Sequence, residues 1–380
     1  MCVFKKDIDN PRFKGDKKVF CSDKRKLKIG IDCGVCTECR NRRATDWRQR
    51  LMEEKNHNSS NMWFVTMTFS DEELYKFEQY NKALGIYSEG YDLEKWITKL
   101  AVKRFRERWR KKFKKSPRYW FITEKGSDDK FSERLHLHGF IWHDFEESLM
   151  EYYLNDRWQY GRISVDGKAK EGSVIYCTDY MSKFNKLHPN FKPLVRCSHG
   201  IGRDYITEQK KREHWQNGDF VGTYKFRNGK KVALCKYYKH KLTTEEQRSK
   251  IWTKALNENK KYLRGQEYNC NDIVQLRRYE KHLMFVQDQE LKSGVRPHEK
   301  VERNVKLKRI LERQALKYDE ECKTWKKKWD NLNLGKSTWN EEQYLEQLMS
   351  YTEREQKRQI AYLKNLKSIA EKQMKGSPSL

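Results

Sequence analysis

A pair of histidines on either side of one leucine stands inside an otherwise mostly apolar segment, Arg134–Trp142. The apolar run predicts a buried β-strand, and alternate residues of a strand project to the same face. His136 and His138 therefore project together, while Leu137 packs on the opposite face. Two neutral imidazoles side by side form a ready pair of metal ligands. Strand histidines also occur as hydrogen-bonded structural residues, so this segment alone leaves both roles open.

Two tyrosines, Tyr176 and Tyr180, are four residues apart in a later segment that ends at Lys183. On a helix, this spacing places both phenols and the lysine on one face. Tyrosines with helical spacing also pack at the edges of cores, so the pair alone is a weak signal. Together with the histidine pair, it indicates an enzyme that cuts single-stranded DNA and holds it covalently.

The charge of the chain favours a polyanionic partner. Its 380 residues, enough for two or three domains, contain 82 Lys and Arg against 54 Asp and Glu, a net charge of +28. A merely soluble basic protein is the alternative, but 12 Trp, 21 Tyr and 17 Phe argue against it. Basic residues interleaved with aromatic rings suit single-stranded nucleic acid, because bases stack on rings while phosphates meet cations.

The cysteines predict a second metal site. The chain starts without the apolar run of a signal peptide and has no run long enough to span a membrane, so we expect a reducing cytosol rather than disulfides. Cys33, Cys36 and Cys39 have knuckle spacing, and Cys21 or Cys2 is the candidate fourth ligand. Such a set predicts structural Zn²⁺ in a region too polar to fold on its own core. An iron–sulfur cluster or a chance group of free thiols stays open.

Hydrophobic patterning predicts three regions: a Cys-rich segment over 1–42, a catalytic domain over 43–240, and charged helices over 241–380. Strands are expected around 62–69, 119–123, 134–142 and 162–165, with a hairpin turning at Asn228-Gly229. Helices are expected from Arg43, from Ser70, over 92–115 and over 146–154. Apolar stripes beyond residue 300 (Leu307–Leu316 and Tyr344–Leu366) predict helix packing within the chain or between copies.

The helix expected over 92–115 is the predicted DNA-binding surface. Its apolar positions follow helical spacing, and its other faces carry basic residues of one sign. The DNA-binding candidates chosen from them are Arg104, Arg108, Lys111 and Lys112. A solvated helix face is the alternative for any single lysine.

Phosphodiester cleavage explains why these groups belong together. It requires a nucleophile, neutralisation of charge on the phosphoryl oxygens and in-line geometry. Mg²⁺ or Mn²⁺ on His136 and His138 would polarise the phosphate, with Glu124 from the preceding strand as third ligand or, alternatively, an exposed strand-end carboxylate. A tyrosine phenolate, favoured by Lys183, would attack phosphorus and leave a 5′-phosphotyrosine and a free 3′-hydroxyl.

In combination, these segments resemble the HUH endonucleases, and more closely the rolling-circle replication initiators of Microviridae, the gokushovirus-like single-stranded DNA phages. Phe64–Thr68 resembles the first strand of the family, Arg134–His138 its metal motif, and Tyr176–Lys183 its nucleophile motif. Cys33–Arg43 and Ser198–Gly202 also resemble segments of these initiators, so that the resemblance covers about residues 1–210. Leu135 and Leu137 depart from the proline and tyrosine of many relatives but keep the strand apolar.

The resemblance implies an α+β fold with a central antiparallel sheet of HUH type backed by helices. It implies that Tyr176 and Tyr180 alternate as nucleophiles on a circular phage genome, in the cytoplasm of a bacterial host and alongside a host helicase or polymerase. A relaxase or transposase-type nickase, or a noncatalytic zinc-containing nucleic-acid-binding protein, stays open. The sequence leaves open which tyrosine cuts first, the oligomeric state and the role of residues 241–380.

Overall fold

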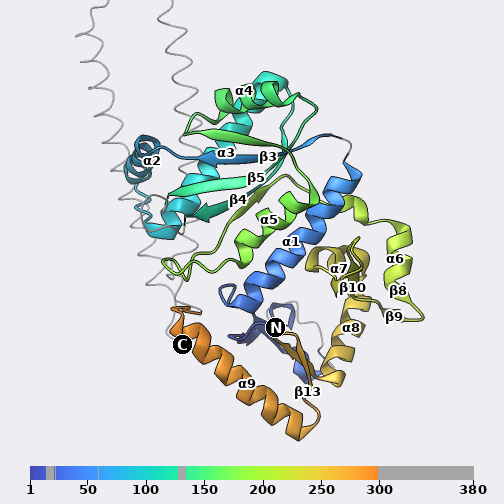
Figure 1. Ribbon diagram of the computed structural model, residues 1–380. Coiled ribbons are helices and arrows are strands. Elements are labelled where there is room, and N and C mark those ends of the chain that lie inside the picture. The colour runs from blue at the N-terminus through green and yellow to red at the C-terminus, as the bar shows by residue number, and fades with distance from the viewer. Residues whose placement is uncertain (14–20, 22, 59, 127–133, 298–380) are drawn as a thin grey trace, which may run out of the picture. The chain divides into compact units, whose positions relative to one another are not determined.

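The structure, a computed structural model, describes residues 1–13, 21, 23–58, 60–126 and 134–297 (Figure 1). Residues 1–74 and 97–299 belong to one compact unit, and residues 75–96 belong to a second unit with the chain after 300. Each unit is described by itself. The apolar stripes expected beyond residue 300 lie outside the described residues.

A five-stranded antiparallel sheet forms the centre of the first unit, with strand order β6-β3-β5-β4-β7. The strands are β3 (Met62–Thr68), β4 (Arg118–Lys125), β5 (Leu135–Trp142), β6 (Ile163–Lys168) and β7 (Val195–Cys197). The central antiparallel sheet expected from the sequence is confirmed, and the two histidines lie on its middle strand. Gly139 of β5 is required by close packing, because a Cβ there would lie 2.0 Å from the carbonyl oxygen of Trp120.

Helices cover both faces of this sheet. On one face, α1 (Thr37–His57) and α5 (Glu171–Ser182) pack side chains such as Leu51 and Met181 against Trp120 and Phe140 (Figure 1). On the other face, α3 (Gly90–Phe113) and α4 (Glu147–Trp158) contribute Phe105 and Trp158, whose rings contact each other and, for Phe105, Phe121 of β4. Burial of these large rings on both faces stabilises the sheet that carries the histidines.

The N-terminal segment shares a small core with residues 260–295. Cys2, Cys33 and Val35 pack with Leu263 and Val286. The elements involved are β1 (Lys6–Asp9), β2 (Lys28–Ile31), β12 (Lys260–Leu263), β13 (Gln266–Asn269) and α9 (Ile273–Lys292). The β12–β13 hairpin was not expected from the sequence, which predicted only helices beyond residue 241. The predicted region boundaries at 42 and 240 stay predictions.

A third cluster surrounds Tyr205, Tyr224 and Tyr238. It includes the expected hairpin, whose turn residue Gly229 has a φ of +82°. The elements here are α6 (Glu208–His214), β8 (Trp215–Gln216), β9 (Asp219–Phe220), β10 (Thr223–Lys225), β11 (Lys231–Ala233), α7 (Lys236–Leu242) and α8 (Glu245–Glu258). The remaining helix, α2, spans Asp71–Ala83. No helix in the described part of the chain is long and apolar enough to cross a membrane.

Candidate metal and tyrosine site

Glu124, His136 and His138 meet on the face of the sheet that α1 and α5 cover. Glu124 of β4 is directly opposite His136 of β5 in the antiparallel register, so both side chains lie on one face. Glu124 Oε2 is 3.2 Å from His136 Nε2 and 3.0 Å from His138 Nε2. Glu124 and His138 are buried and His136 is half-buried. One carboxylate oxygen and two imidazole nitrogens therefore converge on a common point.

The other nitrogen of each imidazole is already bound within the protein. His136 Nδ1 is 2.9 Å from the carbonyl oxygen of Arg134, an acceptor, so Nδ1 carries the proton. His138 Nδ1 is 3.0 Å from the hydroxyl of Thr66, which is itself 3.4 Å from Asp166 Oδ2. If Thr66 donates to this carboxylate, it accepts from His138 Nδ1. Both Nε2 atoms are then left with lone pairs directed toward Glu124, the arrangement that metal-binding histidines need.

The electrostatics of the group are those of a hydrogen-bonded cluster of opposite charges. Burial alone would raise the pKa of Glu124, but hydrogen bonds from both histidines lower that pKa to about 2. Burial would lower the pKa of His136, and the hydrogen bond with Glu124 outweighs it and raises that pKa. Glu124 is therefore an anion at neutral pH, as a cation ligand must be.

Tyr180 of α5 lies against the histidines. Its ring is stacked on the imidazole of His138, with centroids 4.5 Å apart and an interplanar angle of 7°. Tyr180 is 9% exposed, and its burial, followed by its hydrogen bond with Tyr176, raises the pKa of its phenol. The helical spacing predicted from the sequence thus places this tyrosine beside the candidate metal ligands.

Tyr176 occupies the same face of α5, one turn earlier. Its ring centroid is 5.0 Å from that of Tyr180 and 6.0 Å from that of Phe64. In contrast to Tyr180, it is 54% exposed. The two phenols are therefore neighbours in different environments, one buried against the histidines and one open to solvent.

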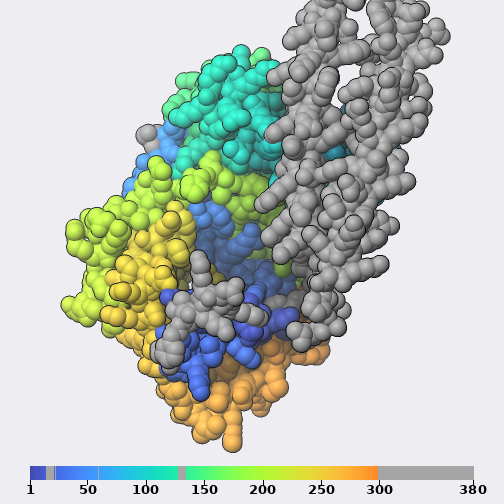
Figure 2. Space-filling view, turned by 180° about the vertical axis from the view of Figure 1, so that it is seen from behind, coloured from blue at the N-terminus to red at the C-terminus, as the bar shows by residue number. Residues whose placement is uncertain are grey.

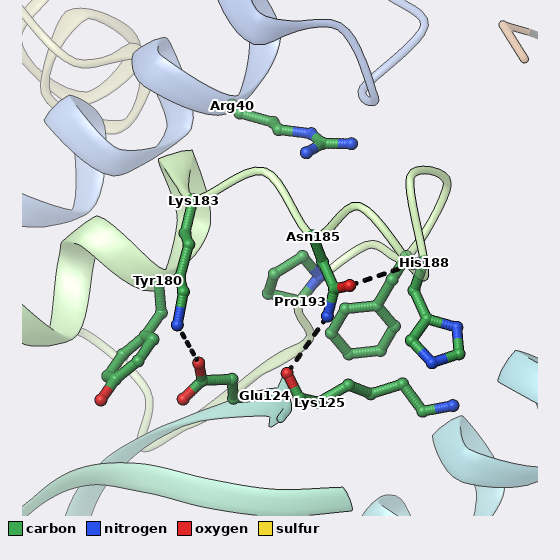
Figure 3. Close-up of a pocket in the computed structure, with 9 residues that line it drawn as sticks. Arg40, Glu124, Lys125, Tyr180, Lys183, Asn185, His188 and Pro193 are labelled. Carbon is green, nitrogen blue, oxygen red and sulfur yellow. Dashed lines mark hydrogen bonds and ion pairs between the residues drawn. The ribbon is translucent and has the colours of Figure 1, made fainter. Parts of the chain in front are cut away.

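Lys183 ends α5 and connects the tyrosines to the carboxylate. Its Nζ donates a hydrogen bond of 3.2 Å to Glu124 Oε1 and lies 5.7 Å from the centre of the Tyr180 ring. Figure 3 shows the ammonium pointing at the carboxylate, within a pocket that Arg40, Asn185 and other residues of the segment after α5 also line. Lys183, predicted from the sequence to favour a phenolate, is close to both groups.

The donor set fits a divalent metal ion. A carboxylate oxygen and two imidazole nitrogens all lie within 4.8 Å of one another. Oxygen donors suit Mg²⁺ and Mn²⁺, while imidazole favours transition metals, so the mixed set fits Mn²⁺ better than Mg²⁺. The three residues predicted as ligands are brought together; the identity of the ion stays a prediction.

Four buried cysteines form a second group that could hold a metal: Cys2, Cys33, Cys36 and Cys39. The sequence left the fourth member open between Cys21 and Cys2, and Cys21 was the first choice. The structure places Cys2 in the group, and the thiol of Cys21 donates instead to the carbonyl oxygen of Asp23 at 3.1 Å. Cys21 precedes β2 by several residues, and spacing alone could not show that the start of the chain returns to the knuckle.

The predicted DNA-binding helix, α3, lies on the face of the sheet opposite the histidines. Arg108 has an intramolecular role, because its guanidinium donates to the carbonyl oxygens of Arg157 and Trp158 and to Tyr160 Oη. Lys111 and Lys112 are exposed, and Arg104 is half-buried. Contact of this helix with DNA stays a prediction, and Arg108 is the least suitable of the four residues for it.

Several residues of the site were not found from the sequence. Thr66 and Asp166 support His138, and Arg40 lines the pocket beside Glu124. Thr66 was part of the strand used for the resemblance, but its hydroxyl carried no signal of its own. Strand order was the missing information, because β3 and β6 are neighbours of β5 only in the folded sheet.

Two comparisons with known proteins bear on the site. A family model described as replication-associated protein ORF2 matches residues 62–185. The replication-associated protein ORF2 of Spiroplasma virus 4 is 27% identical over 236 residues, which cover 57% of this chain and 69% of that protein. No solved structure matches. The residues in the family match include Glu124, both histidines and both tyrosines, and the comparisons support a role in viral DNA replication.

Proposed function

We propose that the protein initiates rolling-circle replication by nicking single-stranded DNA at an origin through a tyrosine nucleophile. The observation that carries this proposal is the stack of Tyr180 on His138, because it joins a nucleophile to a cluster of metal ligands. The similarity to viral replication-associated proteins agrees with it. The finer assignments follow the sequence resemblance: an HUH endonuclease of a Microviridae-like phage, acting on a circular single-stranded genome in the bacterial cytoplasm, with a host helicase or polymerase.

Glu124 and the Nε2 atoms of His136 and His138 would hold Mg²⁺ or Mn²⁺. When bound, this ion supplies positive charge that polarises the scissile phosphate. The chain keeps these ligands ready for it: Arg134 and Thr66 fix the orientation of the imidazoles, and the low pKa of Glu124 keeps it ionised.

The tyrosine supplies the covalent step. Its phenol oxygen bonds to phosphorus, and the bond from phosphorus to the 3′ oxygen breaks with its electron pair. The leaving oxygen takes up one proton, which balances the proton that the phenol releases. The ammonium of Lys183, beside Tyr180, favours the phenolate electrostatically. Attack by a 3′-hydroxyl on the phosphotyrosine reverses the step and rejoins the strand.

Two tyrosines permit two successive transfers. A strand held on one phenol leaves the other available to cut the regenerated origin after a round of synthesis. Tyr176 and Tyr180, with ring centroids 5.0 Å apart, are close enough to serve one scissile position in turn. Repeated transfer of this kind favours replication over a single transposition event.

The test is formation of a covalent adduct. The full-length protein is incubated with Mn²⁺ or Mg²⁺ and single-stranded circular DNA of its own replicon, and adducts are resolved on a denaturing gel. We expect an adduct that His136→Ala/His138→Ala and Tyr176→Phe/Tyr180→Phe abolish. Tyr152→Phe is the matched control, because Tyr152 is 63% exposed on α4 and should leave the adduct intact. Tight DNA binding without an adduct in any variant would instead support a noncatalytic binding protein.

A further inference from the structure

The four-cysteine group has the dimensions of a tetrahedral metal site. Its sulfur atoms all lie within 4.8 Å of one another, and Cys2 Sγ and Cys36 Sγ are 4.0 Å apart. A tetrahedral Zn²⁺ with zinc–sulfur bonds of about 2.3 Å would place the sulfurs about 3.8 Å apart. Closing the group around an ion therefore requires only small movements.

The backbone around the group is arranged for thiolates rather than thiols. The amide of Cys33 donates to Cys2 Sγ at 3.2 Å, and the amide of Cys36 donates to Cys33 Sγ at 3.4 Å. Gly34 permits the tight turn between them, with a φ of +76° that other residues rarely adopt. Such amide donors stabilise negative charge on sulfur.

Positive groups also surround the cysteines. Cys36 is the N-cap of α1, so the positive end of that helix faces the group, and Arg42 Nη2 lies 3.8 Å from Cys39 Sγ. One carboxylate opposes them, because Glu290 accepts from the amide of Thr37 at 3.1 Å. Four thiolates with Zn²⁺ leave two negative charges, which these neighbours and Arg40 would balance.

The same group is attached to the segment that follows the tyrosine helix. Lys192 Nζ donates to the carbonyl oxygen of Cys33 at 3.2 Å. Arg40, the residue after Cys39, donates to the carbonyl oxygen of Pro189 and lies 5.1 Å from the centre of the Phe184 ring. Two contacts from the knuckle thus hold both ends of residues 184–192.

That segment in turn forms one wall of the candidate site. Asn185 Nδ2 donates to the carbonyl oxygen of Lys125, next to Glu124, and the amide of Leu194 donates to Thr123 Oγ1 at 2.8 Å. Figure 3 shows Asn185, His188 and Pro193 beside Lys183 and Glu124 in one pocket. The cysteine group and the Glu124 group are therefore connected through a single short segment.

We propose that Cys2, Cys33, Cys36 and Cys39 bind one Zn²⁺, and that this site holds residues 184–194 in place beside Glu124 and Lys183. The proposal does not depend on nicking activity. It assigns the zinc a positioning role at the tyrosine site in addition to stabilising the N-terminal segment.

Metal content tests the first part. We expect about one zinc per full-length chain by elemental analysis, lost in Cys36→Ser and retained in Cys21→Ser and Cys270→Ser. Cys270 is the matched control, because it is buried in the same apolar cluster but lies outside the four-cysteine group. Co²⁺ substitution should give the visible absorption of a tetrahedral thiolate site. Purified protein without zinc, with iron and sulfide instead, or with zinc unaffected by Cys36→Ser, would overturn the proposal.

Hydrogen exchange tests the second part. In Cys2→Ser, we expect the amides of Phe191 and Leu194 to exchange about tenfold faster or more, with the amides of β3 and β5 unchanged. Lys192→Met covers the case in which the cysteine variant does not fold, since it should keep its zinc and still accelerate exchange in 184–194. Unchanged exchange in Lys192→Met would show that the knuckle does not hold this segment, even if zinc is bound.

Discussion

The ring of Tyr180 lies parallel to the imidazole of His138, with 4.5 Å between their centroids. This contact joins α5 to the middle strand of the sheet, and it fixes one of two neighbouring tyrosines beside the candidate metal ligands. Tyr176 contacts Tyr180 edge-on and is mostly exposed. The two tyrosines of the predicted pair are therefore not equivalent.

This asymmetry predicts an order of cleavage. We expect Tyr180→Phe to lower the rate of the first cleavage by roughly 10³-fold or more, because it removes the phenol oxygen while keeping the stacked ring. Tyr176→Phe should leave the first cleavage within about threefold of wild type and block only the second transfer. The measurement is single-turnover adduct formation on an origin oligonucleotide, followed by strand transfer to a second oligonucleotide. Equal loss of the first step in both variants would contradict the order.

The Glu124–histidine cluster predicts a pH dependence of stability in metal-free protein. The pKa of Glu124 falls from its ordinary 4.5 to about 2, so its contribution is present above pH 4.5 and is lost as the pH falls toward 2. The pKa of His136 is raised above its ordinary 6.5, so its contribution is present below pH 6.5 and is lost as the pH rises through the raised value. The pair should therefore stabilise the fold most between pH 4.5 and 6.5.

The measurement is the melting temperature of wild type and Glu124→Gln in the presence of a chelator. Glutamine keeps the size of the side chain and removes its charge. The difference between the two proteins should be largest in the stated window and smaller on either side of it. A difference that does not change with pH would mean that Glu124 acts by packing alone.

The sequence predicted the sheet and the site residues because each rests on a local pattern. The alternation around His136 gave the middle strand, and the spacing of Tyr176 and Tyr180 gave one helix face. The sequence could not predict which strands lie side by side, and so missed the support of Thr66 and Asp166 for His138. It also could not predict that Cys2 joins the knuckle, because a contact between residues 2 and 33 has no periodic signature.

Thr66 provides a test of that long-range support. Thr66→Val keeps the shape of the side chain but removes the hydroxyl next to His138 Nδ1. Loss of such a partner of a metal-binding histidine weakens metal affinity by about 10–100-fold, and we expect that loss for Mn²⁺ measured by calorimetry. Thr66→Ser should restore most of the affinity, because it returns the hydroxyl. Weak binding in both variants would indicate a packing defect in β3 rather than a lost hydrogen bond.

The turn at Gly202 gives the last prediction. Gly202 has a φ of +71°, and a Cβ there would lie 2.4 Å from the carbonyl oxygen of Arg50 in α1. Its amide donates to Glu54, whose carboxylate also pairs with Arg118 of β4. This turn thus joins the helix that packs on the tyrosine helix to the strand that carries Glu124. Gly229 is a matched control, because its φ is +82° and a Cβ there would meet nothing within 4 Å. Gly229→Ala should cost only the left-handed backbone conformation, about 1–2 kcal/mol. Gly202→Ala should cost clearly more, about 3 kcal/mol or above, because backbone must also move. The midpoints of denaturant unfolding compare the two variants directly, and equal losses would show that the approach of Gly202 to Arg50 is relieved without cost.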